Sequence, residues 1–148
     1  MLDVEVQTLR KVPLFRDIEP PCLQLIAFVA SRVTFQADET IFEAGSAGDA
    51  VYIVLNGEAD IFVTMPDGGK VKLATFGPGR SFGEIGVLTD ADNSMTIVAH
   101  SQVCLLQIQK SDFLELTREI PQLSFAVMRD LARRLDHMIH RFASHFPQ

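Results

Sequence analysis

Short β-branched segments recur through the middle of this 148-residue chain, and residues that favour tight turns separate them. Asn56-Gly57 is a strong hairpin signal, and Asp67-Gly68-Gly69 marks another turn. Short strands at this spacing, joined by glycine-rich turns, are typical of a barrel or jelly roll. The expected strands are Arg32–Phe35, Thr40–Phe42, Ala50–Leu55, Glu58–Val63, Val71–Phe76, Thr96–His100 and Val103–Ile108.

Helical patterns flank this β-rich region on both sides. Residues 1–30 are expected to be helical, and Pro20-Pro21 suits the first turn of a second helix, where a backbone N–H has no helical partner. Ser111 is a candidate N-cap for a short helix that Pro121 ends. A longer helix is expected from about residue 122 to residue 144.

The composition is that of an ordinary globular domain, with 47% hydrophobic and 22% charged residues. We therefore expect a single domain over residues 1–148 that is mainly β with flanking α. Its centre is expected to be a double-stranded β-helix (jelly-roll) barrel over residues 31–109. Helical residues 1–30 precede this barrel, and C-terminal helices over residues 111–148 follow it.

The net charge of −6 gives the chain no obvious basic face. Nucleic-acid binding by this chain alone is not expected, because phosphate contacts need clustered lysine and arginine. A signal peptide is not expected from the first residues, and no apolar run reaches the roughly 20 residues that a membrane helix needs. We expect a cytoplasmic protein without a membrane partner. Cys22 and Cys104 lie in apolar surroundings and are expected to be buried free thiols.

Apolar side chains of the last helix form two neighbouring rows. Such a wide stripe has two interpretations, which both stay open. In one, one row covers the mouth of the barrel while the other meets a partner helix in a homodimer. In the other, the helix packs only on its own barrel. The first row, at 3-4-3-4 spacing, is Met128, Leu131, Leu135, Met138 and Phe142, and the second is Phe125, Ala132, Ile139 and Phe146.

Residues 79–96 carry the pattern that points most directly to a ligand. Gly83 and Gly86 let the backbone approach a ligand without a Cβ in the way. Free N–H groups at the start of the short helix expected here form an anion site. Glu84 adds a carboxylate that can accept a hydrogen bond from a hydroxyl beside that anion. An anion next to a hydroxyl describes a phosphorylated sugar.

This stretch resembles the phosphate-binding cassette of cyclic nucleotide-binding domains, the family of the catabolite activator protein and the protein kinase regulatory subunits. The family pattern is approximately F-G-E-[LI]-[AG]-[LV]-L, a short loop, and P-R-[STA]-A-T-[VI]. A second run, from Glu43 to Gly57, is similar to the family's E-x-G-x-x-G-D-x-x-Y-x-[IV]-x-x-G. The matching cassette residues are Phe82, Gly83, Glu84, Ile85, Gly86, Val87, Leu88, Ser94, Thr96 and Ile97.

Two cassette positions depart from the family pattern. Asp92 stands where proline is usual, and Asn93 stands where the family carries the arginine that pairs with the phosphate. A hydrogen bond from a neutral amide contributes about 0.5–1.5 kcal/mol to binding, whereas a charge-assisted hydrogen bond from an arginine contributes about 1.5–3 kcal/mol. The phosphate site is therefore expected to be about tenfold weaker. Arg80 and Lys72 are nearby in sequence and are candidates to supply the missing charge.

The resemblance implies a role for each site residue. After Phe82, the backbone amides of Gly83, Ile85 and Gly86 would hold the cyclic phosphate. Glu84 would accept a hydrogen bond from the ribose 2′-hydroxyl. As an alternative, Glu84 caps its short helix or pairs with a neighbouring arginine, Arg80.

Two more side chains have both a ligand role and a simpler one. Ser94, which follows Asn93, would reach the phosphate or the base, or it is a hydroxyl at a strand end that is satisfied locally. Arg134 would reach the nucleotide from the long helix, or it forms a surface ion pair with Asp130, four residues earlier.

The sequence thus predicts a regulatory module that binds a cyclic nucleotide, with cyclic AMP as the expected ligand, and transmits occupancy through the C-terminal helix. The alternative is a degenerate cassette that binds no nucleotide and serves as a dimerisation or interaction domain. Catalysis is not expected, because the strand region holds only His100 and not the cluster of histidines that a metal-dependent barrel enzyme needs, and no paired carboxylates stand in a recognisable frame. His137 and His140 lack a third ligand at a suitable spacing, so no metal is expected.

Overall fold

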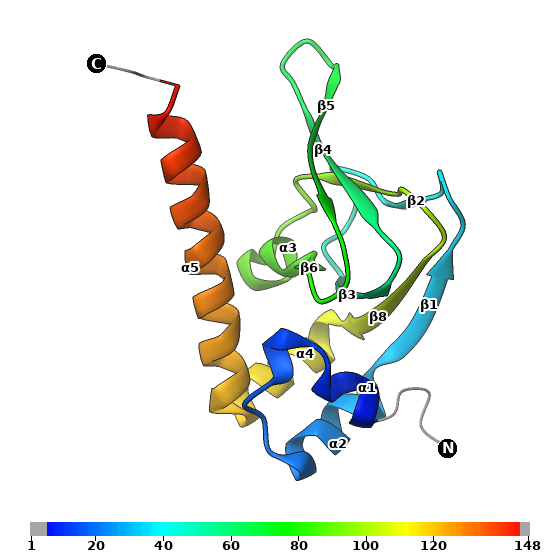
Figure 1. Ribbon diagram of the computed structural model, residues 1–148, viewed down its shortest axis with the longest axis vertical. Coiled ribbons are helices and arrows are strands. Elements are labelled where there is room, and N and C mark those ends of the chain that lie inside the picture. The colour runs from blue at the N-terminus through cyan, green and yellow to red at the C-terminus, as the bar shows by residue number, and fades with distance from the viewer. Residues whose placement is uncertain (1–5, 146–148) are drawn as a thin grey trace.

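The strands of this protein form two antiparallel four-stranded sheets that wrap around a shared core (Figure 1). The computed structural model describes residues 6–145, so predictions for residues 1–5 and for Phe146 lie outside the described residues. One sheet has the order β1-β8-β3-β6 and the other the order β2-β7-β4-β5. The strands are β1 Ser31–Phe35, β2 Thr40–Phe42, β3 Ala50–Asn56, β4 Ala59–Thr64, β5 Lys70–Phe76, β6 Ser81–Phe82, β7 Thr96–Ala99 and β8 Val103–Gln109.

The predicted jelly-roll fold is confirmed, and the seven expected strands match the observed ones to within one residue at each end. The turn glycine Gly57 has φ 86° and reverses the chain between β3 and β4. The hairpin prediction for Asn56-Gly57 is wrong, because β3 and β4 lie in different sheets and the turn carries the chain from one sheet to the other. Strand β6 was not predicted. It is two residues long and lies inside the cassette, so it carries no alternation of its own.

Strand β3 is buried on both faces, which explains its uninterrupted apolar sequence. Tyr52 and Val54 point into a cluster between the two sheets, whereas Val51 and Ile53 point into a cluster shared with the helices. The sheet that contains β3 therefore lies between the barrel interior and the helical layer. Figure 1 shows α1, α2 and α4 below the barrel and α5 rising along one side of it, while the β4–β5 hairpin projects from the top.

The helical layer combines both ends of the chain. Its elements are α1 Val6–Arg10, a 3₁₀ helix η1 Pro13–Phe15, α2 Pro20–Val29, α4 Lys110–Glu119 and α5 Pro121–Ala143, while α3 Glu84–Thr89 lies in the cassette. The prediction that Ser111 caps α4 is wrong. Strand β8 runs directly into α4, so Gln109, which still has an extended backbone, takes the N-cap position without a side-chain hydrogen bond. Pro121 does end α4, and it also occupies the first turn of α5.

Helix α5 contacts the rest of the protein through a third stripe of side chains, which shares only Leu131 with the two predicted rows. Leu123 and Val127 are buried, Leu131 packs against the same helical cluster, and Arg134 follows on that face. The expectation that one of the two apolar rows covers the barrel mouth is wrong. Phe125 and Ile139 of the second row are 54% and 55% exposed. The members of the first row other than Leu131 are also exposed, namely Met128, Leu135, Met138 and Phe142.

Both cysteines are free thiols, as predicted, but they are half-buried rather than fully buried. Cys22 packs at the edge of the helical cluster. Over residues 6–145, no helix combines the length and the apolar character needed to cross a membrane.

Candidate functional site

The cassette is a tight strand–turn–helix unit that only glycine permits at its centre. Gly83 follows β6 with φ 91° and forms the N-cap of α3. A Cβ at Gly83 would lie 2.6 Å from the carbonyl oxygen of Ala50, so any side chain is excluded by space as well as by φ. Gly48 packs just as closely, because a Cβ there would lie 2.4 Å from the Ala91 carbonyl oxygen. The loop before β3 is thereby pressed against the cassette.

Glu84 is held by Arg134 of α5. Arg134 Nη1 donates to Glu84 Oε1 at 2.7 Å, and the Glu84 residue is only 3% exposed. Arg134 Nη2 donates to the carbonyl oxygen of Ser81 at 2.6 Å and to its hydroxyl at 3.0 Å. The same nitrogen lies 2.9 Å from Asp130 Oδ2, so the predicted ion pair is present together with the contact to the cassette. One guanidinium therefore ties the long helix to both β6 and α3.

Two features of this contact were not accessible from the sequence. Ser81 was not among the predicted site residues, because a serine before the motif has no distinctive signal. The partner of Glu84 is Arg134, fifty positions away, and not Arg80. Arg134 Nε is buried and has no hydrogen-bond partner among the described residues. The Nε–H of Arg134 can thus donate one further hydrogen bond without the loss of a present one.

Asn93 fastens the cassette to the loop before β3. Its side chain donates to the Ser46 hydroxyl at 3.2 Å and to the Ala47 carbonyl oxygen at 3.1 Å, and the residue is 7% exposed. Its backbone adds two bonds, one to the Ser46 carbonyl oxygen and one from the Gly45 N–H. Both hydrogens of the Asn93 amide therefore have acceptors inside the protein.

The arrangement of a glycine-centred turn, a buried carboxylate and a long helix tied to it agrees with the comparison to known sequences. Residues 32–119, more than half of the chain, match the sequence model of the family described as "Cyclic nucleotide-binding domain". The chain belongs to this family. The family prediction made from the two motifs is thereby confirmed.

Relatives of this cyclic nucleotide-binding domain include longer proteins. It is 33% identical to the "Cyclic AMP receptor protein" of Thermus thermophilus over 123 residues, which is 83% of this chain and 57% of the relative. The crystal structure of the Thermus thermophilus catabolite activator protein matches with a TM-score of 0.80 and 31% identity, over 88% of this chain and 62% of that one. The chain spans about three fifths of the length of these two proteins.

One relative is named as an enzyme. Lysophospholipase NTE1 of Chaetomium globosum is 31% identical over 120 residues, which is 81% of this chain but only 8% of the enzyme. The similarity is thus confined to a small part of that protein.

The other predicted site residues lie around the cassette in different environments. Phe82 is fully buried and stacks on Tyr52, with ring centroids 5.4 Å apart, so its side chain belongs to the barrel core. Gly86 is buried, and Ile85 is 42% exposed at the surface of α3. Ser94 is exposed. Besides Asn93 and Arg134, the predicted site residues therefore offer backbone atoms and the hydroxyl of Ser94 to a ligand, and Glu84 offers the carboxylate that Arg134 holds.

The cations that were candidates to replace the family arginine have definite positions. Lys72 is turned to another part of the domain, where its Nζ lies 3.1 Å from Asp60 Oδ1. Arg80 stacks on Phe76, with Cζ 4.0 Å from the ring centroid. Lys110, which was not among the predicted candidates, forms an ion pair with Asp90 at the end of α3.

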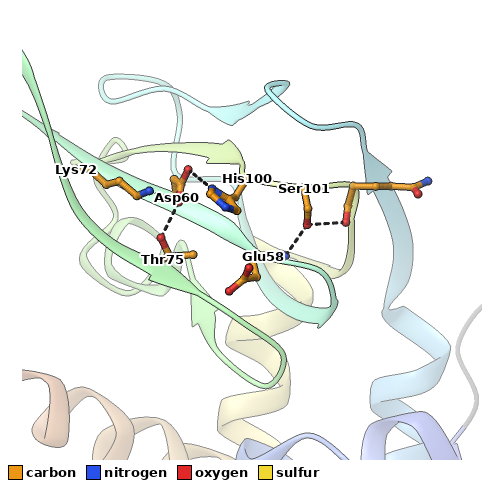
Figure 2. A network of polar contacts seen from close by, with 7 residues as sticks. Glu58, Asp60, Lys72, Thr75, His100 and Ser101 are labelled. Atoms are coloured by element: carbon orange, nitrogen blue, oxygen red, sulfur yellow. Dashed lines mark hydrogen bonds and ion pairs between the residues drawn. The ribbon is translucent and has the colours of Figure 1, made fainter.

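Figure 2 shows the polar network around Asp60, which lies on β4 between two residues that point into the barrel core. Thr75 donates to Asp60 Oδ1 at 2.7 Å, and His100 Nδ1 lies 3.0 Å from Asp60 Oδ2. Burial alone would raise the pKa of Asp60, but hydrogen bonds from Thr75, His100 and Lys72 together lower it below its usual value. The network joins β4, β5 and the end of β7.

The sequence did not connect His100 with Asp60, since forty positions separate them. A histidine beside a carboxylate can serve as a base, but the other side-chain partners in this network lie on β5, and the pair joins neighbouring strands. Within residues 6–145, no group of three or more metal-ligating side chains is present. His140 instead lies against the Asp136 carbonyl oxygen at 2.8 Å on the same helix.

Proposed function

We propose that this domain is a regulatory module that binds a cyclic nucleotide, with cyclic AMP as the expected ligand, at residues 79–96. The observation that carries this proposal is the contact from Arg134 of α5 to Glu84 and Ser81. It supports a direct path from the ligand site to the long helix. The residues proposed to bind the ligand are Phe82, Gly83, Glu84, Ile85, Gly86, Asn93, Ser94 and Arg134.

A ribose hydroxyl at Glu84 would compete with, or share, the bond that Arg134 now makes. Because Glu84 Oε1 already accepts from Arg134, a second donor changes the strength of the tether between α3 and α5. A ligand can shift a helix only by as much as its contacts differ between the two helix positions. The Glu84–Arg134 contact provides such a difference, and movement of α5 is the proposed output.

Calorimetric titration of the protein with cyclic AMP and cyclic GMP tests the proposal directly. Replacing Glu84 by alanine should weaken cyclic AMP far more than 2′-deoxy cyclic AMP, because the analogue already lacks the hydroxyl that Glu84 accepts. Equal losses for the two ligands would remove Glu84 from the sugar contact. No measurable binding of either cyclic nucleotide to the unmodified protein would reject the binding function.

A second candidate function is a degenerate cassette that serves as a dimerisation or interaction domain. The observation in its favour is Asn93, whose amide hydrogens are both used inside the protein. A cassette closed in this way would give no heat with cyclic nucleotides while the protein still self-associates. The same titration, combined with light scattering, distinguishes the two functions.

Homodimerisation through α5 is proposed for either function. The first apolar row is long for a helix that contacts its own barrel through a different stripe, and Leu135 and Met138 in it are 58% and 63% exposed. A second copy of α5 would cover both side chains by packing them into a seam of the coiled-coil type. Cytoplasmic location, a single domain over residues 1–148, and the absence of catalysis, membrane binding and nucleic-acid binding by this chain alone remain predictions.

A further inference from the structure

A bound cyclic phosphate needs a positive charge, and the structure narrows the residues that can supply it. Lys110 and Arg134 both contact the cassette, but both already pair with acidic residues. Lys72 is paired on the barrel wall. Arg80, within the cassette itself, has no acidic partner among residues 6–145. Of the four cations compared, Arg80 is therefore the one whose charge is uncompensated.

The backbone around Arg80 is well fixed. The carbonyl oxygen of Arg80 accepts from the Val54 N–H at 2.9 Å, and its own N–H donates to the Gly77 carbonyl oxygen at 3.2 Å. The residue thus closes the turn between β5 and β6 and is anchored to β3. Its side chain is exposed, so the charged end can meet a ligand from solvent.

Phe76 brings Arg80 close to the tether of α5. The Arg80 guanidinium carbon lies 4.0 Å from the Phe76 ring centroid, and that of Arg134 lies 5.5 Å from the same centroid. Arg134 in turn binds Glu84. Two guanidinium groups therefore share one ring beside the carboxylate that is proposed to bind the ribose.

We propose that Arg80 neutralises the phosphate of the ligand in this domain. In the family pattern this role belongs to an arginine at the position that Asn93 occupies here. This inference rests on the proposed binding of a cyclic nucleotide. Stacking on Phe76 occupies the face of the guanidinium and leaves its N–H edge available for an anion. Because the group is exposed, its contribution falls as salt rises.

The test compares cyclic AMP with adenosine, which has the same base and ribose but no phosphate. Arg80→Gln should weaken cyclic AMP about tenfold at low salt and leave adenosine unchanged, because only the phosphate contact is lost. Arg80→Lys, which keeps the charge, should restore part of the affinity. Raising the salt concentration should weaken cyclic AMP binding in the unmodified protein and have less effect in Arg80→Gln.

Lys72→Gln is the matched control, since it removes an equal charge from the neighbouring strand β5 and should change neither affinity. Thermal unfolding of each variant shows that the fold is retained. Unchanged cyclic AMP affinity in Arg80→Gln, or equal losses for cyclic AMP and adenosine, would overturn the assignment while the binding function stands. If the unmodified protein binds no cyclic nucleotide, the proposed function fails and this inference fails with it.

Discussion

Replacing Arg134 by alanine should destabilise this domain, because it removes the polar contact between α5 and the cassette. The variant loses bonds to Glu84, to two Ser81 oxygens and to Asp130. The loss at Glu84 dominates, because its side chain is 4% exposed and would be left as a buried carboxylate without a partner.

Removing one partner of a buried ion pair costs about 3–5 kcal/mol. The Arg134 side chain is 18% exposed, so water can enter the space that it leaves, and we expect a cost nearer the lower end of that range. The contact to Asp130, whose side chain is 37% exposed, adds at most about 1 kcal/mol. For a chain of this size, a loss of about 3 kcal/mol corresponds to a fall in Tm of roughly 6–12 °C.

Urea unfolding followed by circular dichroism measures this free energy, and two further variants show where it comes from. Asp130→Asn should cost less than about 1 kcal/mol, because it removes only the partly exposed contact. The double variant with Arg134→Ala and Glu84→Gln should lose less unfolding free energy than the two single variants lose in sum, because no buried charge remains. If Arg134→Ala costs no more than Asp130→Asn, the buried pair does not exist in solution and the proposed tether is wrong.

Three other predictions concern the ligand, the dimer and the sheet. Asn93→Arg should lower the dissociation constant for cyclic AMP about tenfold in a calorimetric titration, and an unchanged dissociation constant would place the phosphate away from position 93. Leu135→Asp should convert a dimer into a folded monomer in light scattering, because it puts a charge in the apolar seam, whereas Phe28→Asp on α2, at a site 75% exposed, should leave the dimer intact. An unmodified protein that is monomeric at high micromolar concentration would refute the dimer. Asp60→Asn should lower the free energy of unfolding by about 1–2 kcal/mol at neutral pH. Because the folded pKa of Asp60 is lowered, this difference should be complete above about pH 4 and shrink as the pH falls further, and a difference independent of pH would contradict the charged network.

The sequence by itself determined the features that depend on near neighbours in the chain. Alternating β-branched residues and turn glycines such as Gly57 predicted the strands, because side-chain period and allowed φ are local properties. Gly83 and Glu84 were identified with the family motif for the same reason, since the turn, the short helix and the buried carboxylate lie within a few residues. These signals were sufficient for the fold class and the cassette.

The tertiary structure alone decided which partners those residues have. Apolar periodicity on α5 indicated several possible faces, and only packing selected the stripe of Leu123, Val127 and Leu131. Arg134 lies on that face and reaches Glu84 because the barrel brings α3 beside α5.

The same holds for contacts between strands and loops. Asn93 binds Ser46 across 47 positions, and His100 lies against Asp60 across 40. Each contact is between side chains whose spacing in the chain has no fixed relation to their distance in space. A sequence pattern records how a residue sits on its own element, whereas the energy of a buried charge or amide depends on the element folded against it.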